Sequence, residues 1–242
     1  KWTSGGIHCS PITARLVVQR IGVDASRLRV HEIGDVFVVQ GVRTVFLDAN
    51  HCPGAVMILF MFSPSHCVLH TGDFRYSPKM QNYPWLSVAR VTTLILDTTY
   101  CDPQYDFPPQ EAVTEFVIDA IRAERFNPRT LFLIGSYTIG KERIFLEVAK
   151  RLESKVYVGN NKYEILKSLG LPKEYQDLIT ADDNQAHIHV VPMGSLSFKR
   201  MRSISKHYRG RFSSVVSVHR THARGAPFES SWLRCHCYCS SL

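Results

Sequence analysis

The sequence predicts an α/β protein in two parts, and three observations support this fold class. Up to about residue 97, apolar segments of strand length follow one another along the chain. From residue 98 onward, strand-like and helix-like segments alternate, which is typical of a parallel sheet covered by helices. Between the two patterns, Pro103, Pro108 and Pro109 interrupt regular structure, so we expect the boundary there.

The first part is expected to be rich in strands. Residues 5–9 predict a short strand, and Ser10 followed by Pro11 favours a helix start, because serine caps helices well and proline suits the first turn. Gly22 favours the end of that helix. The strands expected after it lie at residues 36–39 and 42–47, which form a hairpin around Gly41, and at 57–62, 67–69 and 94–96.

The second part predicts helices and strands in alternation. The expected strands lie at residues 131–134, 156–158 and 188–191, and the expected helices at 110–125, 140–152, 161–169 and 199–208. After about Val218 neither period is visible. The sequence therefore predicts three regions, which span residues 1–97, 98–216 and an unpatterned tail at 217–242.

The composition favours a protein that binds a polyanion. Lys and Arg together number 29 against 21 Asp and Glu, a formal net charge of +8, which favours nucleic acid as a partner, although a basic surface without a ligand is the alternative. No apolar run reaches the roughly 18 residues of a membrane span. The first residue is Lys1, so we expect an internal fragment or an incomplete gene model.

The seven cysteines do not form the pattern of a secreted disulfide framework, which indicates a reducing compartment. The cluster at residues 235–239 reads Cys-His-Cys-Tyr-Cys and invites a metal-site interpretation. Its alternating spacing differs from the two-residue gaps of a zinc knuckle, so we do not favour that interpretation.

Two short motifs carry the strongest chemical signal. ANHCPGAV places His51 after one predicted strand, and HTGDFR places Asp73 after another, 22 residues later. Histidine nitrogen and carboxylate oxygen are ligands that zinc takes in proteins, and a carboxylate can bridge two cations. Each residue alone is more often a structural turn residue. Arg75, close behind Asp73, is expected to pair with a carboxylate rather than with phosphate.

A third motif, GSYTIGKE at residues 135–142, lies between a predicted strand and a predicted helix. Backbone amides at a helix start, a hydroxyl group and a lysine make a phosphate site, so Ser136, Tyr137 and Lys141 are candidates for contact with a DNA phosphate. The alternative is an ordinary capped helix with a solvated Lys141.

Together these motifs resemble the metallo-β-lactamase nucleases of the β-CASP group, and most of all the DNA cross-link repair branch with its Pso-type, Artemis and Apollo relatives. The resemblance covers roughly residues 1–216 and implies a partial metallo-β-lactamase αββα sandwich with an inserted β-CASP α/β domain. It implies that His51 is a zinc ligand and Asp73 the metal-bridging carboxylate. LILDTTY resembles the first β-CASP motif, with Asp97 as its acid, and IHV resembles the second, with His189; the neighbouring His187 fits that register less well.

The resemblance implies a function. It implies a metal-dependent 5′-to-3′ exodeoxyribonuclease of interstrand cross-link or double-strand break repair, with one or two zinc ions, acting in the nucleus on DNA that is damaged or carries a 5′ phosphate. Asp73, Asp97 and His189 would be its catalytic group. The family's His-x-His-x-Asp-His motif and late histidine ligand do not occur in the chain. Since a catalytic zinc normally takes three protein ligands, we expect the chain alone to be inactive or very weak.

Two alternatives stay open. One is a truncated, non-catalytic fragment that binds nucleic acid. The other is an RNA-processing endonuclease of the β-CASP group, although the wording DTTYC at residues 97–101 favours the DNA branch.

Overall fold

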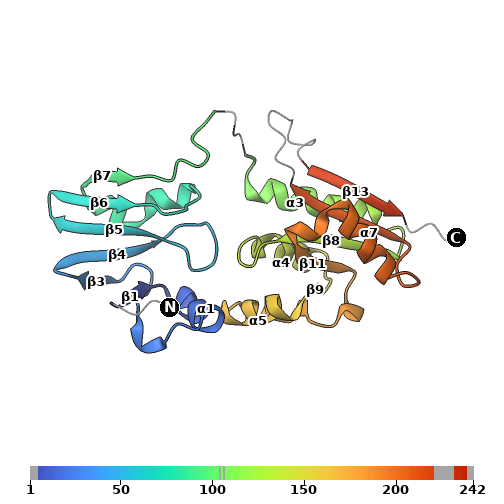
Figure 1. The fold of residues 1–242 in the computed structure, drawn as a ribbon. Helices are drawn as coiled ribbons and strands as arrows, with labels where there is room; N and C mark the ends of the chain where they lie inside the picture. The colour runs from blue at the N-terminus through green and yellow to red at the C-terminus, as the bar shows by residue number, and fades with distance from the viewer. Residues whose placement is uncertain (1–4, 104, 106, 221–231, 239–242) are drawn as a thin grey trace. The chain divides into compact units, whose positions relative to one another are not determined.

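A computed structural model describes residues 5–103, 105, 107–220 and 232–238 (Figure 1). The chain divides into two compact units, Lys1–Cys101 and Asp102–Leu242. Each unit combines sheets with helices, which confirms the predicted α/β class. Among the described residues, no helix has both the length and the apolar character needed to cross a lipid bilayer.

The first unit is built on a five-stranded sheet in the order β3-β4-β5-β6-β7. Its strands are β3 (Val36–Val39), β4 (Val42–Asp48), β5 (Val56–Ser63), β6 (His66–His70) and β7 (Val91–Ile95). The first four pair antiparallel in succession, and β7 pairs parallel with β6. Strands β4, β6 and β7 therefore run in the same direction and end at the same edge of the sheet (Figure 1).

Strand β1 (Ile7–Cys9) is followed along the chain by helix α1 (Pro11–Ile21), the short 3-10 helix η1 (Ala25–Arg27) and strand β2 (Leu28–Val30). Strands β1 and β2 pair with each other in parallel. The helix starts and ends as predicted: the Ser10 side chain accepts a hydrogen bond from the Thr13 N–H, and Gly22 adopts the left-handed conformation that closes the last turn. These local signals were sufficient to predict the helix from sequence.

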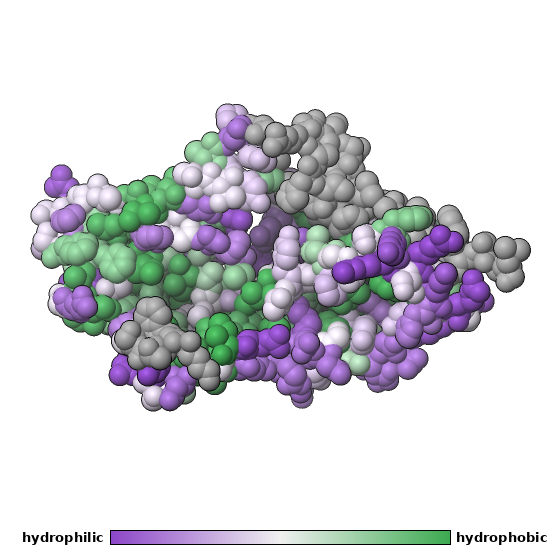
Figure 2. All heavy atoms as spheres, in the orientation of Figure 1, coloured by the Kyte–Doolittle hydropathy of each residue, from purple (hydrophilic) through white to green (hydrophobic). Residues whose placement is uncertain are grey.

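The core of the first unit lies under β4, β5 and β6, where Val45, Leu47 and Leu59 are buried. Two elements that the sequence analysis did not predict pack against it, η2 (Pro78–Asn82) and α2 (Pro84–Val88). By contrast, all five residues of β7 are exposed, and Figure 2 shows further apolar side chains on the visible surface of this unit. The last strand of the sheet is thus its least buried one.

The second unit contains a six-stranded sheet in the order β10-β9-β11-β8-β12-β13. Its strands are β8 (Thr130–Ser136), β9 (Val156–Val158), β10 (Ile179–Thr180), β11 (Ile188–Pro192), β12 (Ser214–Arg220) and β13 (Trp232–Tyr238). All pair parallel except β13, which pairs antiparallel with β12. The central strand β8 is buried along its whole length, as expected where both faces of a parallel sheet are covered.

The backbone corrects one prediction about the end of the chain. The sequence pattern predicts no strand after Val218, whereas β12 continues to Arg220 and β13 follows at Trp232–Tyr238. Leu233, Cys235 and Cys237 alternate with polar residues, a two-residue period that the sequence analysis missed. The candidate metal cluster lies outside what the structure describes, because neither the side chains of residues 235–238 nor any part of Cys239 is described.

Four of the five described α-helices of the second unit lie close to their predicted positions, and the short helix at Lys173–Gln176 was not predicted. The five helices are α3 (Gln110–Glu124), α4 (Glu142–Arg151), α5 (Asn160–Ser168), α6 (Lys173–Gln176) and α7 (Phe198–His207), with the 3-10 helices η3 (Asp183–Gln185) and η4 (Met193–Leu196) between strands. Helix α4 begins two residues later than Gly140, its predicted start, because Lys141 adopts a left-handed backbone conformation (φ 67°) that a right-handed helix cannot contain.

We expect Gly54→Ala to destabilise the chain more than Gly41→Ala. Both glycines have positive φ, 87° and 83°, so alanine is strained at each by about 1–2 kcal/mol. Only at Gly54 would the new methyl group lie 2.8 Å from Thr13 Oγ1, and the Gly54 carbonyl accepts hydrogen bonds from Ser10 (2.8 Å) and Thr13 (3.0 Å). Loss of these bonds adds roughly 1 kcal/mol each. Urea unfolding measures both variants, and equal losses would contradict the close contact with α1.

Candidate functional site

The first unit gathers three of the predicted site residues at one edge of its sheet. His51 follows β4, Asp73 follows β6 and Asp97 follows β7, and these strands end at the same edge. The Nε2 atom of His51 lies 4.0 Å from Oδ2 of Asp73, and their side chains are 31% and 82% exposed. The structure thus brings the two predicted metal ligands together as a solvent-accessible pair.

Hydrogen bonds hold the loops that carry this pair against each other. The side-chain amide of Asn50 donates to the Arg75 carbonyl (3.1 Å), and the Arg75 N–H donates to the Ala49 carbonyl (2.9 Å). Asn50 has a positive φ of 51°, which asparagine tolerates better than most residues. The segment before His51 and the segment after Asp73 are therefore fixed to each other by these two hydrogen bonds.

The Asp97 side chain forms hydrogen bonds within its own loop. Its Oδ1 accepts hydrogen bonds from the Thr99 hydroxyl (2.5 Å) and the Thr99 N–H (2.9 Å), while its Oδ2 lies 3.3 Å from Nη1 of Arg75. These Thr99 bonds, followed by the charge of Arg75, hold the pKa of Asp97 below its ordinary value. The pairing predicted for Arg75 is confirmed. With both oxygens engaged, Asp97 fixes the segment that follows Asp73.

The His51–Asp73 pair fits a divalent metal in part. Two ligands of a tetrahedral zinc, each about 2.1 Å from the metal, lie roughly 3.4 Å apart, close to the separation found here. The chemistry of the two donors, imidazole nitrogen and carboxylate oxygen, suits zinc. Among the described residues, however, no group of three or more His, Cys, Asp or Glu side chains is arranged to hold a metal. The pair supplies two ligands of a site.

In the second unit, the segment after β8 carries the predicted phosphate contacts. Tyr137 is 55% exposed, and the Lys141 ammonium lies 5.0 Å from the centre of its ring. Ser136 behaves differently, because its buried hydroxyl donates to the carbonyls of Gly140 (3.1 Å) and Tyr137 (3.2 Å). Tyr137 is thus open to solvent with Lys141 beside its ring, whereas Ser136 is bonded within the loop.

A buried ion pair that the sequence analysis missed holds this loop in place. Glu142 is only 4% exposed, and both of its oxygens accept the Gly140 N–H, at 2.9 and 2.8 Å. The Lys162 ammonium donates to Glu142 (2.6 Å) and to the carbonyls of Tyr137 (3.0 Å) and Thr138 (3.1 Å). Breaking one side of such a pair costs about 3–5 kcal/mol, because a charge is left buried alone. Glu142 stands inside the recognised motif, but no local signal pointed to Lys162.

His189 lies inside the core of the second unit, on β11. It is 1% exposed, its Nε2 lies 3.2 Å from the Ala186 carbonyl, and its ring packs against Tyr157 and Tyr208. Burial lowers its pKa to about 4, so the folded unit holds the ring neutral at physiological pH. The structure therefore does not place His189 at a surface where it would meet substrate, as a catalytic role would require.

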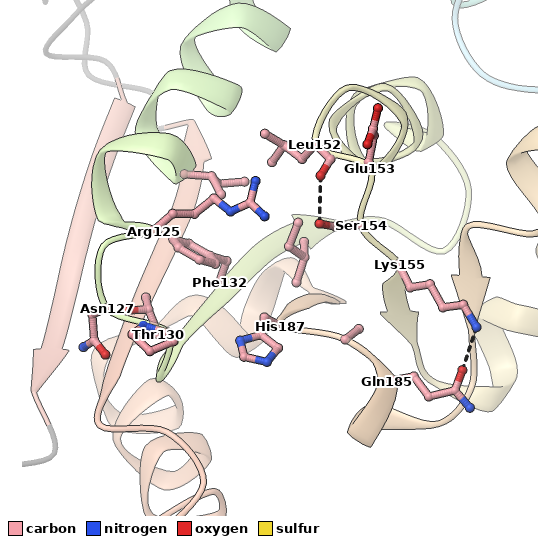
Figure 3. Close-up of a pocket in the computed structure, with 14 residues that line it drawn as sticks. Arg125, Asn127, Thr130, Phe132, Leu152, Glu153, Ser154, Lys155, Gln185 and His187 are labelled. Atoms are coloured by element: carbon pink, nitrogen blue, oxygen red, sulfur yellow. Dashed lines mark hydrogen bonds between the residues drawn. The ribbon is translucent and has the colours of Figure 1, made fainter.

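A cavity of about 460 Å³ lies at the other end of the second unit's sheet (Figure 3). Arg125, Lys155 and His187 line it, together with the first residues of β8 and β11. Arg125 and Leu152, the residues that cap the C-terminal ends of α3 and α4, are also among its lining residues. The cavity is thus distinct from the loop of Tyr137 and Lys141.

We expect the stability of the chain to fall as the pH is lowered from about 6.5 to 4. In this range the unfolded chain protonates His189, whose ordinary pKa is 6.5, whereas the folded chain does so only near 4. Stability therefore rises with pH across this window, by up to roughly 3 kcal/mol. Urea unfolding at several pH values measures the slope. His189→Gln should flatten it, while His187→Gln, an exposed neighbour, should not; an unchanged slope in His189→Gln would contradict the assignment.

Comparison with known proteins gives consistent relatives. A family model described as DNA repair metallo-beta-lactamase matches residues 173–227, beyond the expected end of the resemblance at 216. The chain is 38% identical to the DNA cross-link repair protein SNM1 of Arabidopsis thaliana, covering 91% of this chain and 46% of that protein. It is 41% identical to the DNA cross-link repair 1A protein of Mus musculus (89% and 21%) and 35% identical to the 5′ exonuclease Apollo of Gallus gallus (81% and 42%).

The chain spans less than half the length of each of these curated relatives. A crystal structure of a protein of unknown function from Enterococcus faecalis V583 matches with a TM-score of 0.58 at 14% identity, covering 81% of this chain and 54% of that chain, which supports the fold alone. The similarity in sequence extends over most of the chain. Over most of its length the chain is thus similar in sequence to DNA cross-link repair proteins, and the DNA repair metallo-beta-lactamase model matches part of it.

Proposed function

We propose that the chain carries part of the active centre of a DNA-repair nuclease of the metallo-β-lactamase/β-CASP type. The reaction is hydrolysis of phosphodiester bonds, 5′ to 3′ along DNA, in the nuclear repair of interstrand cross-links or double-strand breaks. The observation that carries this proposal is the exposed His51–Asp73 pair at one edge of the first unit's sheet. Relatives named as cross-link repair proteins and as a 5′ exonuclease support the choice of DNA.

Each residue has its own role in the proposed function. His51 and Asp73 bind a divalent metal, zinc by the preference of its imidazole ligand, and when bound the metal polarises a phosphoryl oxygen for attack. Arg75 and Asp97 keep the segment of Asp73 in position through their ion pair of 3.3 Å. In the second unit, Lys141 and Tyr137 contact a DNA phosphate, for which we propose the 5′-terminal one.

A specific observation favours a second candidate function, nucleic-acid binding without hydrolysis. The described residues supply two metal ligands, and a catalytic zinc normally takes three. We therefore propose that the chain alone is inactive or very weak. The genomic sequence upstream of Lys1 separates the two candidates: an in-frame His-x-His-x-Asp-His motif supports the nuclease, and its absence supports the binding function.

Zinc binding by this chain should be weak and should need both residues of the pair. We expect Asp73→Asn and His51→Gln each to lower zinc affinity by at least about tenfold, since changes outside the ligand shell alone cost that much. Competition with a chromophoric chelator measures the affinity. His66→Gln is the matched control, because His66 is an exposed histidine at the start of β6, at the opposite end of that strand. An affinity that does not respond to either substitution would place the metal elsewhere.

The same samples test hydrolysis on 5′-labelled single-stranded DNA and RNA. We expect rates near background for the chain and no further loss in Asp73→Asn. Cleavage of DNA that Asp73→Asn abolishes would contradict the inactivity of the chain and establish the nuclease directly. Preferential cleavage of RNA would instead support the RNA-processing alternative.

Lys141→Asn should weaken binding of 5′-phosphorylated DNA by about tenfold, the order expected for a lost charge-assisted hydrogen bond. Asparagine is chosen because it tolerates the left-handed backbone at this position (φ 67°), so that the loss reports on the charge. Lys150→Asn, at the end of the same helix, is the control. Binding measured with 5′-phosphate and 5′-hydroxyl strands distinguishes a terminal phosphate from an internal one. An equal effect of both substitutions would remove the phosphate role of Lys141.

A further inference from the structure

Exposed aromatic and basic side chains gather at the end of the second unit's sheet where β8 and β11 finish. Tyr137 follows β8 and is 55% exposed, and Phe198 begins α7 and is 70% exposed. An apolar ring of this size normally gains stability by burial, so a phenylalanine left in water is informative when cationic residues follow it in the sequence. Lys199 and Arg200 follow Phe198 directly and are exposed as well.

The short helix η4 joins these groups into one surface. The Lys141 ammonium lies 3.7 Å from the sulfur of Met193, and Nη1 of Arg200 donates to the Gly194 carbonyl at 3.1 Å. Met193 and Gly194 are adjacent in η4, so Lys141 and Arg200 reach the same segment from the start of α4 and from α7. Lys141 and Arg200 therefore both lie beside η4.

The charges on this surface are arranged for an anion. Helix α7 has Lys199 and Arg200 in its first turn and no acidic residue there, although the positive end of a helix dipole favours acids. Within the described part of the chain, no ion pair with Lys199 or Arg200 is formed. The repulsion between these cations and the helix end is relieved when a negatively charged ligand lies beside them.

We infer that this surface, formed by Tyr137, Lys141, Phe198, Lys199 and Arg200, binds single-stranded DNA. Cations that contact phosphates, interspersed with aromatic rings on which bases stack, are the usual means of holding a single strand without reading its sequence. A duplex keeps its base faces covered, so it can use the cations but not the rings. The inference rests on the proposed DNA function and specifies the form of DNA that the second unit holds.

Fluorescence anisotropy with labelled oligodeoxythymidine of about 12 nucleotides, within the usual range of single-strand sites, tests the surface. EDTA is present, so binding is measured without hydrolysis. Phe198→Ala should weaken binding about tenfold, the order of one base–aromatic stack, whereas Phe198→Trp keeps the ring and the affinity. Arg200→Gln should weaken binding and lower the salt dependence by about 0.7 in log–log slope, the value for one phosphate on a single strand.

A matched pair of residues lies at the opposite end of the same sheet. Arg125 and Phe126 are exposed between α3 and β8, with Phe126 at 83%. Arg125→Gln and Phe126→Ala should leave single-strand affinity unchanged. Circular dichroism confirms that each variant folds.

Equal losses for Phe198→Ala and Phe126→Ala, or no loss for Phe198→Ala, would overturn the inference. An equal loss of duplex binding would overturn it as well, because base stacking would not be involved. A chain that binds the strand through Phe198 but never cuts DNA leaves the inference standing while it removes the nuclease function. A chain that cuts DNA with unchanged binding in Phe198→Ala gives the reverse result.

Discussion

Strand direction is the constraint on which both candidate sites depend. Strands that run the same way end at the same edge, and β4, β6 and β7 do so although β5 between them runs oppositely. Residues that are distant in sequence, such as His51 and Asp73, therefore lie close together there, with 4.0 Å between their side chains. In the second unit the parallel strands β8 and β11 place the loop of Lys141 beside η4 in the same manner.

Ion pairs and hydrogen bonds to charged groups then hold the loops that strand direction brings together. The Glu142 carboxylate satisfies the Gly140 N–H and Lys162, and Lys162 in turn satisfies two loop carbonyls, so a whole turn depends on one buried pair. The first unit uses a more exposed version, in which Arg75 bonds Asp97. Buried charges of this kind contribute little net stability but penalise alternative conformations, because each alternative leaves a charge without a partner. A defined loop geometry is what a phosphate contact needs.

Local signals in the sequence predicted the elements that depend on local physics. The cap at Ser10, the end of α1 at Gly22 and the hairpin at Gly41 all depend on residues that are neighbours in the sequence. His51 and Asp73 were predicted because their motifs follow strands. The burial of His189 and the partner of Glu142 were not predictable in this way, since they depend on contacts such as that with Lys162, 20 residues along the chain. In strand β13 apolar and polar residues alternate, but the residues before it have no such pattern, and the strand was not predicted.

The exposed strand β7 has a practical consequence for the behaviour of the protein in solution. It is the last strand of its sheet, and its backbone carries apolar side chains on an edge that another chain can extend by hydrogen bonding. Salts such as sulfate strengthen the burial of apolar surface, so they drive this edge toward self-association as concentration rises. Self-association through β7 would then lower the concentration at which the chain stays monomeric.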